Sequence, residues 1–254
     1  MKAKKSLGQN FLIDKTYILK IIDSIKNINF DLIIEIGPGK GALTKELKKK
    51  NCPLVAFELD KELEPILKLY EDNKTKIIYQ DFLKVDLKNY IKDNNKVLLI
   101  GNLPYYITTP ILEHIIDSNI EINNMIFMVQ KEVADRFCAI CGTKEYGYFT
   151  LYLRYYYNIE KICDVPSTAF NPRPKVTSTI IKFTIRKNKP NINKEKYFKL
   201  IKDSFQLKRK TLKNNLKEYD WNKIKKILLE KNYKETIRAE ELPEEMFIDI
   251  SKII

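Results

Sequence analysis

Cysteine and histidine are both scarce in this sequence of 254 residues, which holds four of the first and one of the second. Cys138 and Cys141 have the spacing of a metal clip, but a structural zinc needs about four ligands. The chain offers no second cysteine pair, and its single histidine, His114, is distant in sequence. We therefore expect no metal site and reduced thiols, which fit a cytosolic protein.

Long apolar runs are lacking as well. No stretch reaches the roughly 18 consecutive apolar residues that cross a bilayer. The N-terminal Met-Lys-Ala-Lys-Lys leads at once into patterned sequence, without room for a signal or transit peptide. The sequence thus predicts a cytoplasmic protein without a membrane partner.

Positive charge, by contrast, is abundant and local. The formal net charge is +13 and the pI about 9.3, so a polyanionic partner is expected. Residues 186–238 hold 18 Lys and Arg against 6 Asp and Glu, whereas residues 1–185 hold 27 against 22. This basic segment, with Lys2, Lys4 and Lys5, predicts phosphate contacts and salt-sensitive binding. A solvated helical surface is the alternative.

The first two-thirds of the chain alternates apolar runs with amphipathic stretches. Such alternation is typical of βαβ units, so we predict an α/β fold with a mostly parallel sheet. The predicted strands are residues 32–36, 54–57, 76–79, 97–100 and 125–129, and the predicted helices between them are 42–49, 61–70 and 111–119. Residues 150–157 and 178–185, rich in β-branched and aromatic side chains, are predicted to pair as later strands.

A polar segment, Asn188-Lys-Pro-Asn-Ile-Asn193, is the one convincing linker. It divides the chain into two predicted domains, 1–187 and 188–254. Beyond it, apolar residues recur at helical spacing at positions 198, 201, 205, 212 and 216. Further helices are predicted at 221–229 and 243–253, so a small helical domain is expected to follow the sheet.

Glycines cluster at one predicted strand-to-helix turn, Gly37-Pro-Gly-Lys-Gly41. Glycine lets a backbone approach a ligand closely, but the third glycine comes one residue early for the dinucleotide fingerprint. Glu58 ends the next apolar run, where it can accept hydrogen bonds from ribose hydroxyls. Asp81 and Phe82 follow the third run, where a carboxylate can accept from an adenine amine and a ring can cover the base. Three successive strand ends thus predict a nucleoside pocket.

The motif Asn102-Leu-Pro-Tyr105 follows the apolar run 97–100 and Gly101. It lies where an α/β sheet opens its binding crevice. Asn102 and the Leu103 carbonyl offer acceptors for an exocyclic amine, and Tyr105 offers a face for stacking. By itself the motif also fits an ordinary strand-to-helix loop whose tyrosines pack on the core.

Taken in order, these motifs resemble the ribosomal RNA adenine N6-dimethyltransferase family. Lys5-Ser-Leu-Gly-Gln-Asn-Phe-Leu12 resembles the family's N-terminal signature. Two later blocks match as well, Phe170-Asn-Pro-Arg-Pro-Lys-Val-Thr-Ser178 and Phe205-Gln-Leu-Lys-Arg-Lys-Thr-Leu-Lys-Asn-Asn-Leu216. Residues 150–154 depart from the smaller, more aliphatic residues expected there, in a predicted strand that we interpret as structural.

The resemblance implies a Rossmann-like sheet that binds S-adenosylmethionine, followed by a helical domain that contacts RNA. Asn10 and Leu12 would close over the cofactor, Gly37 would lie beside its methionine part, Glu58 would hold its ribose and Asp81 would read its adenine. The full set of cofactor-binding residues implied is Asn10, Leu12, Gly37, Gly39, Glu58, Asp81, Phe82 and Asn102.

The implied reaction is an in-line transfer of a methyl group from a sulfonium to the N6 amine of adenine. The implied catalytic residues are Asn102, Leu103, Pro104 and Tyr105. Acceptors from Asn102 and the Leu103 carbonyl would draw the delocalised amine toward tetrahedral geometry. Tyr105 would stack on the extruded base, and Phe170 would add a second stacking contact unless it simply packs in the core. Since no base is required, we interpret His114 as a helix residue.

The implied substrate is a pair of adjacent adenosines in the 3′-terminal hairpin loop of 16S-type rRNA, within the small ribosomal subunit or its precursor. The protein is expected to act as a monomer in ribosome biogenesis. The closest alternative is a resistance-type methyltransferase of large-subunit (23S) rRNA. Gly8 before Gln9-Asn10-Phe11, and the block at 208–215, favour the small-subunit branch.

Three further alternatives belong to other classes. A catalytically silent RNA-binding assembly factor would have no need of the intact pocket residues. A DNA amino-methyltransferase usually carries proline in place of Leu103, and a nicotinamide-dependent oxidoreductase would need the other glycine spacing.

Overall fold

The computed structural model describes residues 3–4, 7–92 and 96–254, and of Tyr105 it describes the backbone alone. The chain forms two compact units, each built from two stretches of sequence. The first comprises Met1–Ala134 and Glu160–Ile185, and the second comprises Asp135–Ile159 and Arg186–Ile254. The predicted boundary at 187/188 lies close to the point, after Ile185, at which the chain passes from the first unit to the second for the last time. It differs from the structure in that residues 135–159 pack with the C-terminal helices.

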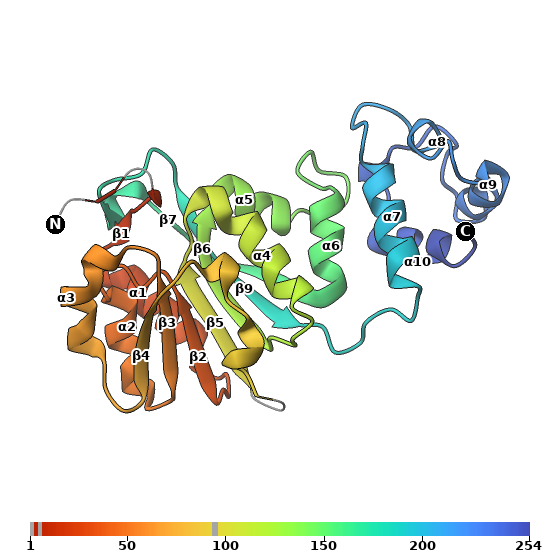
Figure 1. The fold of residues 1–254 in the computed structure, drawn as a ribbon. Coiled ribbons are helices and arrows are strands. Elements are labelled where there is room, and N and C mark those ends of the chain that lie inside the picture. Colours follow the sequence, from red (N-terminus) through yellow and green to blue (C-terminus); the bar gives the residue numbers. More distant parts are fainter. Residues whose placement is uncertain (1–2, 5–6, 93–95) are drawn as a thin grey trace. The chain divides into compact units, whose positions relative to one another are not determined.

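A seven-stranded sheet forms the centre of the first unit, in the order β4-β3-β2-β5-β6-β9-β7 (Figure 1). Strands β2 to β6 run parallel, and β9 runs antiparallel to β6. The strands are β2 (Leu32–Ile36), β3 (Leu54–Glu58), β4 (Thr75–Tyr79), β5 (Val97–Asn102), β6 (Asn124–Gln130), β7 (Tyr157–Val165) and β9 (Ser178–Ile185). The α/β fold and the five predicted parallel strands are therefore confirmed.

Helices alternate with most of the strands, as crossover connections between parallel strands require. They are α1 (Lys15–Ser24), α2 (Ala42–Leu47), α3 (Glu64–Leu67), α4 (Thr108–Asp117) and α5 (Lys131–Phe137). The predicted helices at 42–49 and 61–70 are helical, with 3₁₀ turns at their ends, and the one at 111–119 begins three residues earlier. Helix α1 was not predicted. Its N-cap is Asp14, whose side chain accepts a hydrogen bond from the Thr16 N–H.

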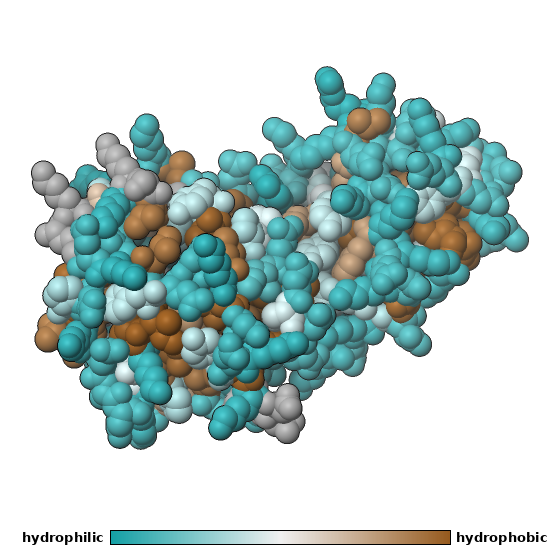
Figure 2. Space-filling model, in the orientation of Figure 1, coloured by the Kyte–Doolittle hydropathy of each residue, from teal (hydrophilic) through white to brown (hydrophobic). Residues whose placement is uncertain are grey.

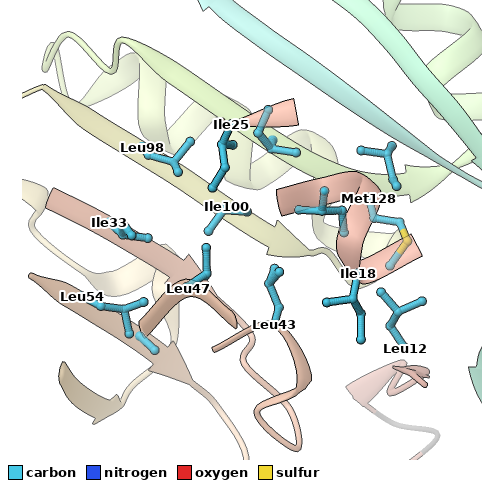
Figure 3. Close-up of a cluster of buried hydrophobic side chains, with 14 of the residues drawn as sticks. Leu12, Ile18, Ile25, Ile33, Leu43, Leu47, Leu54, Leu98, Ile100 and Met128 are labelled. Carbon is cyan, nitrogen blue, oxygen red and sulfur yellow. The ribbon is translucent and has the colours of Figure 1, made fainter. Parts of the chain in front are cut away.

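The core between the sheet and helices α1 to α3 explains why the strands are continuous apolar runs in the sequence. Alternate strand residues, such as Ile33, Leu98 and Ile100, pack against Ile18 and Leu43 on the helices (Figure 3). The intervening strand residues belong to the opposite face, over which α4 lies in Figure 1. A sheet covered on both faces needs apolar side chains at every position.

A second, two-stranded sheet joins segments that are far apart in sequence. Strand β1 (Phe11–Leu12) pairs antiparallel with β8 (Phe170–Asn171), so that Leu12 lies opposite Phe170. This pairing fixes residues 11–12 next to the start of the block 170–178. Neither strand was predicted, because a run of two residues has no period that sequence analysis can detect.

The second unit is helical. It contains α6 (Tyr148–Tyr156), α7 (Lys194–Ser204), α8 (Leu212–Asn215), α9 (Trp221–Glu230) and α10 (Glu244–Ser251). The helices predicted at 221–229 and 243–253 are confirmed. The apolar spacing over 198–216 does not form one helix, since α7 ends at Ser204 and an exposed loop precedes α8.

The strand predicted at 150–157 is wrong, because residues 148–156 form helix α6. Their aromatic side chains favoured a strand, but in the structure the Tyr152 ring packs at a tilt, and the Tyr155 ring edge-on, against Phe198 of α7. The Thr150 hydroxyl donates to the Arg136 carbonyl, which fixes the start of the helix. Tertiary contacts thus override the local strand preference. The neighbour of β9 on the side away from β6 is β7, which begins at Tyr157.

Hydrophilic residues dominate the face of the molecule seen in Figure 2, as expected for a chain in which 31% of residues are charged. Within the described residues, no helix combines the length and the apolar character needed to cross a membrane.

Candidate active site

A pocket opens at the carboxyl ends of β2, β3, β4 and β5, beside the point where the chain changes direction within the sheet. Parallel sheets place ligand sites at this switch point. The pocket encloses about 810 Å³ including its open mouth. Gly37, Glu58, Asp81 and Asn102 all line it, so the four strand ends singled out in the sequence do meet.

The glycine turn after β2 brings main-chain atoms to the pocket floor. Gly39 has φ of +59°, and a Cβ built there would lie 2.9 Å from Cδ1 of Phe11. Only glycine accommodates both this conformation and this contact. The Gly39 N–H donates to Oε2 of Glu58 at 3.0 Å, so the turn and the next strand end are fixed to each other.

Glu58, the last residue of β3, is held in a fixed orientation. Its second carboxylate oxygen, Oε1, accepts from the Asp60 N–H at 2.8 Å. The residue is only 6% exposed. Burial raises the pKa of the carboxyl, against the opposing effect of these backbone hydrogen bonds. The remaining lone pairs are available to hydroxyl groups of a ligand.

Asp81 and Phe82 form the next part of the wall, directly after β4. The Asp81 side chain accepts from the Leu83 N–H at 3.0 Å and starts a short 3₁₀ turn. Phe82 packs edge-on against Phe57 and against His114. His114 lies in α4, as predicted, and its Nε2 is 2.9 Å from the Val85 carbonyl oxygen, so it belongs to the packing behind the pocket.

Asn102 ends β5 on the other side of the glycine turn. Its Nδ2 donates to the main-chain carbonyl of Asn10 at 2.8 Å. The preceding residue, Gly101, allows β5 to approach β2 closely, because a Cβ at position 101 would lie 2.4 Å from the Ile36 carbonyl oxygen. In the sequence, Gly101 marks only the end of an apolar run. The structure makes it a requirement of the site.

The structure describes the rest of the tetrapeptide motif, residues 103–105, only in part. Leu103 and Pro104 line the pocket, and the Leu103 N–H donates to the Met128 carbonyl at 3.1 Å. The side chain of Tyr105 lies outside the described residues. Tyr106, which was not singled out in the sequence, lines the mouth and is 59% exposed.

Three predicted contacts are placed differently from the prediction. Leu12 is buried and lines a neighbouring groove that also reaches Asn102, instead of the nucleoside pocket. Phe170 is 2% exposed in the hydrophobic core, where its ring has no free face for a base. Lys4 does not extend into solvent but pairs with Asp60 and Glu62, while Lys2 and Lys5 lie outside the described residues.

The chemistry of the pocket wall is acidic and apolar. Among the described residues that line it there are two carboxylates, Glu58 and Asp81, and no lysine or arginine. Such a wall would repel a pyrophosphate and favours a nucleoside that carries positive charge. None of the four cysteines forms a disulfide, and no group of three potential metal ligands occurs among the residues described.

Two solved structures share this fold over nearly the whole chain. A dimethyladenosine transferase from Plasmodium falciparum matches with a TM-score of 0.77 at 24% identity, over 94% of this chain and 95% of that one. The 23S rRNA methyltransferase ErmE matches with a TM-score of 0.74 at 21% identity, over 96% and 98%. The chain therefore has the Rossmann-like α/β fold of these two proteins.

The particular family follows from sequence. The family of ribosomal RNA adenine dimethylases matches residues 1–254, and the chain belongs to it. It is therefore an rRNA adenine dimethyltransferase. Ribosomal RNA small subunit methyltransferase A of Clostridioides difficile is 43% identical over all of this chain and 91% of that protein. The protein of the same name from Bacillus pumilus is 43% identical over 84% and 76%.

Proposed function

We propose that this enzyme uses S-adenosylmethionine to dimethylate the N6 amines of two adjacent adenosines in the 3′-terminal hairpin loop of small-subunit rRNA. The observation that carries the proposal is the meeting of Glu58, Asp81 and Asn102 around one pocket at the switch point of the sheet. The names of the 43% identical relatives support the small subunit as the target. We also propose action as a monomer in the cytoplasm, on the subunit or its precursor.

The cofactor fits the residues present. S-adenosylmethionine, when bound, supplies a methyl group on a cationic sulfonium. The carboxylates of Glu58 and Asp81, without a nearby lysine or arginine in the described wall, suit a cationic nucleoside. Glu58 would accept from ribose hydroxyls and Asp81 from the adenine amine, beside Phe82. Gly37 and Gly39 leave room for the amino-acid part of the cofactor, and Asn10 is proposed to cover it.

Asn102 and Leu103 would act on the target amine. The Asn102 amide group donates to Asn10 through Nδ2, so its Oδ1 is directed away from that contact and can accept one hydrogen bond from the N6 amine. The Leu103 carbonyl would accept the other. Acceptors fixed in this way stabilise the positive charge that develops on nitrogen in the transition state. Stacking by Tyr105, after the rigid Pro104, is part of the proposal.

A second base contact is proposed for Phe170 only in a conformation that exposes its ring. In the structure described above the ring packs in the core. Substitution of Phe170 should therefore reduce stability as well as activity.

RNA contacts are proposed for the second unit. The loop before α8 exposes Leu207, Lys208, Arg209 and Lys210. Asn215 fixes this loop in both directions, because it accepts from the Leu207 N–H and donates to the Leu207 carbonyl. A fixed, exposed run of cations is suited to binding the phosphate backbone of RNA.

Transfer of tritiated methyl groups to unmethylated 30S and 50S particles tests the proposal. We expect about two labelled adenosines in each 30S particle, four methyl groups in all, and no label in 50S particles. Mapping of the modified bases then identifies their position. Label in 50S particles alone would replace the proposal with the large-subunit activity. Cofactor binding without transfer to either particle would support a silent assembly factor.

A further inference from the structure

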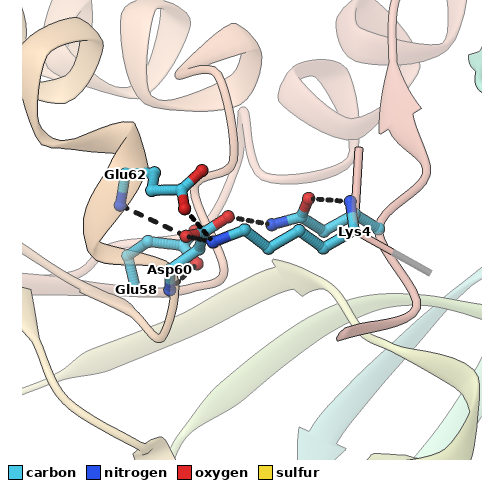
Figure 4. Close-up of polar contacts among 5 residues, drawn as sticks. Lys4, Glu58, Asp60 and Glu62 are labelled. Atoms are coloured by element: carbon cyan, nitrogen blue, oxygen red, sulfur yellow. Dashed lines mark hydrogen bonds and ion pairs between the residues drawn. The ribbon is translucent and has the colours of Figure 1, made fainter. Parts of the chain in front are cut away.

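Asp60 lies two residues after the ribose-binding candidate Glu58, and its side chain is only 2% exposed. A carboxylate buried to this extent needs partners for both oxygens. Oδ1 receives Lys4 Nζ at 2.6 Å, and Oδ2 receives Gln9 Nε2 at 2.8 Å. Both partners come from the start of the chain, more than fifty residues away (Figure 4).

The part of the chain that holds Asp60 also contains hydrogen bonds of its own. We call residues 3–4 and 7–10 the N-terminal segment. The main-chain N–H of Lys4 donates to Oε1 of Gln9 at 2.8 Å, and the Leu7 N–H donates to the Lys4 carbonyl. Lys4 Nζ also reaches Glu62 at 3.0 Å. The two side chains that hold Asp60 are thus connected to each other and approach it as one unit.

The same segment covers the nucleoside pocket. Four of its residues, Leu7, Gly8, Gln9 and Asn10, line the pocket wall. At its far end the Asn10 carbonyl accepts from Asn102. The N-terminal segment is therefore attached at two strand ends, to Asp60 after β3 and to Asn102 at the end of β5.

Asp60 also acts on Glu58 directly. The Asp60 N–H donates to Glu58 Oε1, and the Gly39 N–H holds the other oxygen. A displacement of the Asp60 main chain would rotate the Glu58 carboxylate away from the pocket. The fastening of the N-terminal segment and the orientation of Glu58 consequently depend on one residue.

We propose that Asp60 is a positioning residue of the methyltransferase, which fastens the N-terminal segment over the bound cofactor and orients Glu58 toward it. The inference rests on the proposed function, since it takes the pocket as the cofactor site. Burial by itself raises the pKa of the Asp60 carboxyl, but the hydrogen bonds from Lys4 and Gln9 outweigh it, and the pKa is lowered. The carboxylate is thus charged at neutral pH, as the ion pair requires.

A purely structural role is the competing explanation. Asp60 Oδ1 also accepts from the Glu62 N–H at 3.2 Å and caps the 3₁₀ turn Lys61–Leu63. Substitution of Lys4 separates the two roles, because it removes the ion pair and leaves the cap intact. Lys4 is 33% exposed, so its loss should not unfold the enzyme.

The experiment compares Lys4→Met, Lys4→Arg and Asp60→Asn in the full-length enzyme. Cofactor dissociation constants and dissociation rates are measured by calorimetry and stopped flow, and kcat is measured on 30S particles at saturating cofactor. Lys68→Met is the control, because Lys68 is exposed on the first unit and has no ion pair among the described residues. It should match the wild type.

We expect Lys4→Met to weaken cofactor binding roughly three- to tenfold, chiefly through faster dissociation, with a smaller change in kcat. Lys4→Arg should keep most of the wild-type affinity for the cofactor. Asp60→Asn should bind the cofactor more weakly than Lys4→Met does. Wild-type dissociation constants for both Lys4→Met and Asp60→Asn would overturn the inference. So would a loss of melting temperature and kcat without a change in affinity. Failure of the wild-type enzyme to bind the cofactor at all would instead overturn the proposed function.

Discussion

Asn102 Nδ2 donates a 2.8 Å hydrogen bond to the main-chain carbonyl of Asn10, a residue 92 positions earlier in the chain. The bond fixes which end of the amide is left for a substrate. It also connects the candidate catalytic residue to the segment that covers the pocket. The Asn102→Ala variant tests both consequences.

Asn102→Ala should reduce methyl transfer to 30S particles by about two orders of magnitude or more, the usual effect of removing one fixed acceptor or donor from a transition state. Cofactor affinity should fall less than tenfold, because Asp60 still holds the N-terminal segment. Single-turnover transfer and calorimetry measure the two quantities. Wild-type turnover with normal cofactor affinity would contradict the proposed role.

Gly101→Ala should separate β2 from β5. Its Cβ would lie 2.4 Å from the Ile36 carbonyl oxygen, a backbone atom that cannot move without the strand. We expect the free energy of unfolding to fall by about 1–3 kcal/mol or more, with weaker cofactor binding. Gly147→Ala is the matched control, since a Cβ there meets nothing within 4 Å. Urea denaturation measures both variants, and equal midpoints would contradict the steric argument.

Glu35 makes stability depend on pH. Burial raises the pKa of its carboxyl from 4.5 to about 8, against the opposing hydrogen bond from the Thr44 hydroxyl, which lies 2.7 Å from Oε2. Between these pH values the folded protein keeps a proton that the unfolded chain has released. Stability therefore falls as pH rises from 4.5 to 8 and is level above that range.

Glu35→Gln should remove this dependence, because glutamine resembles the protonated acid and can still accept from Thr44. The variant should gain stability over the wild type as pH rises from 5 to 8.5, by an amount on the order of a few kcal/mol. Thermal melts across this range, with Glu113→Gln on exposed α4 surface as a control, provide the measurement. Parallel curves for wild type and Glu35→Gln would refute the assignment.

The exposed loop of the second unit should contribute to the salt dependence of RNA binding. The slope of log K against log salt is negative. Replacement of Lys208, Arg209 and Lys210 by alanine should reduce its magnitude by roughly 2, if each cation contacts one phosphate. Lys199→Met is the control, because Lys199 already pairs with Asp203. Equal slopes for the triple variant and the wild type on a small-subunit rRNA fragment would exclude this loop from the interface.

The sequence predicted the parallel sheet well because its strands are buried on both faces. Such strands are continuous apolar runs with glycine or polar residues at their ends, and 32–36 and 97–100 are clear examples. It failed at 148–156, where aromatic residues that favour a strand form α6. The contacts of Tyr152 and Tyr155 with Phe198, in a helix more than forty residues later, are absent from any local pattern.

The sequence by itself determined the family, the order of the motifs and the residue types at the strand ends, because these depend on local spacing and on the parallel direction of the strands. Only the tertiary structure decided which of those residues share a pocket wall. It placed Phe170 in the core, paired Lys4 with Asp60 and required glycine at position 101. Each of these outcomes depends on an approach between segments distant in sequence, and such distances are set by packing of the whole unit, which no window of the sequence contains.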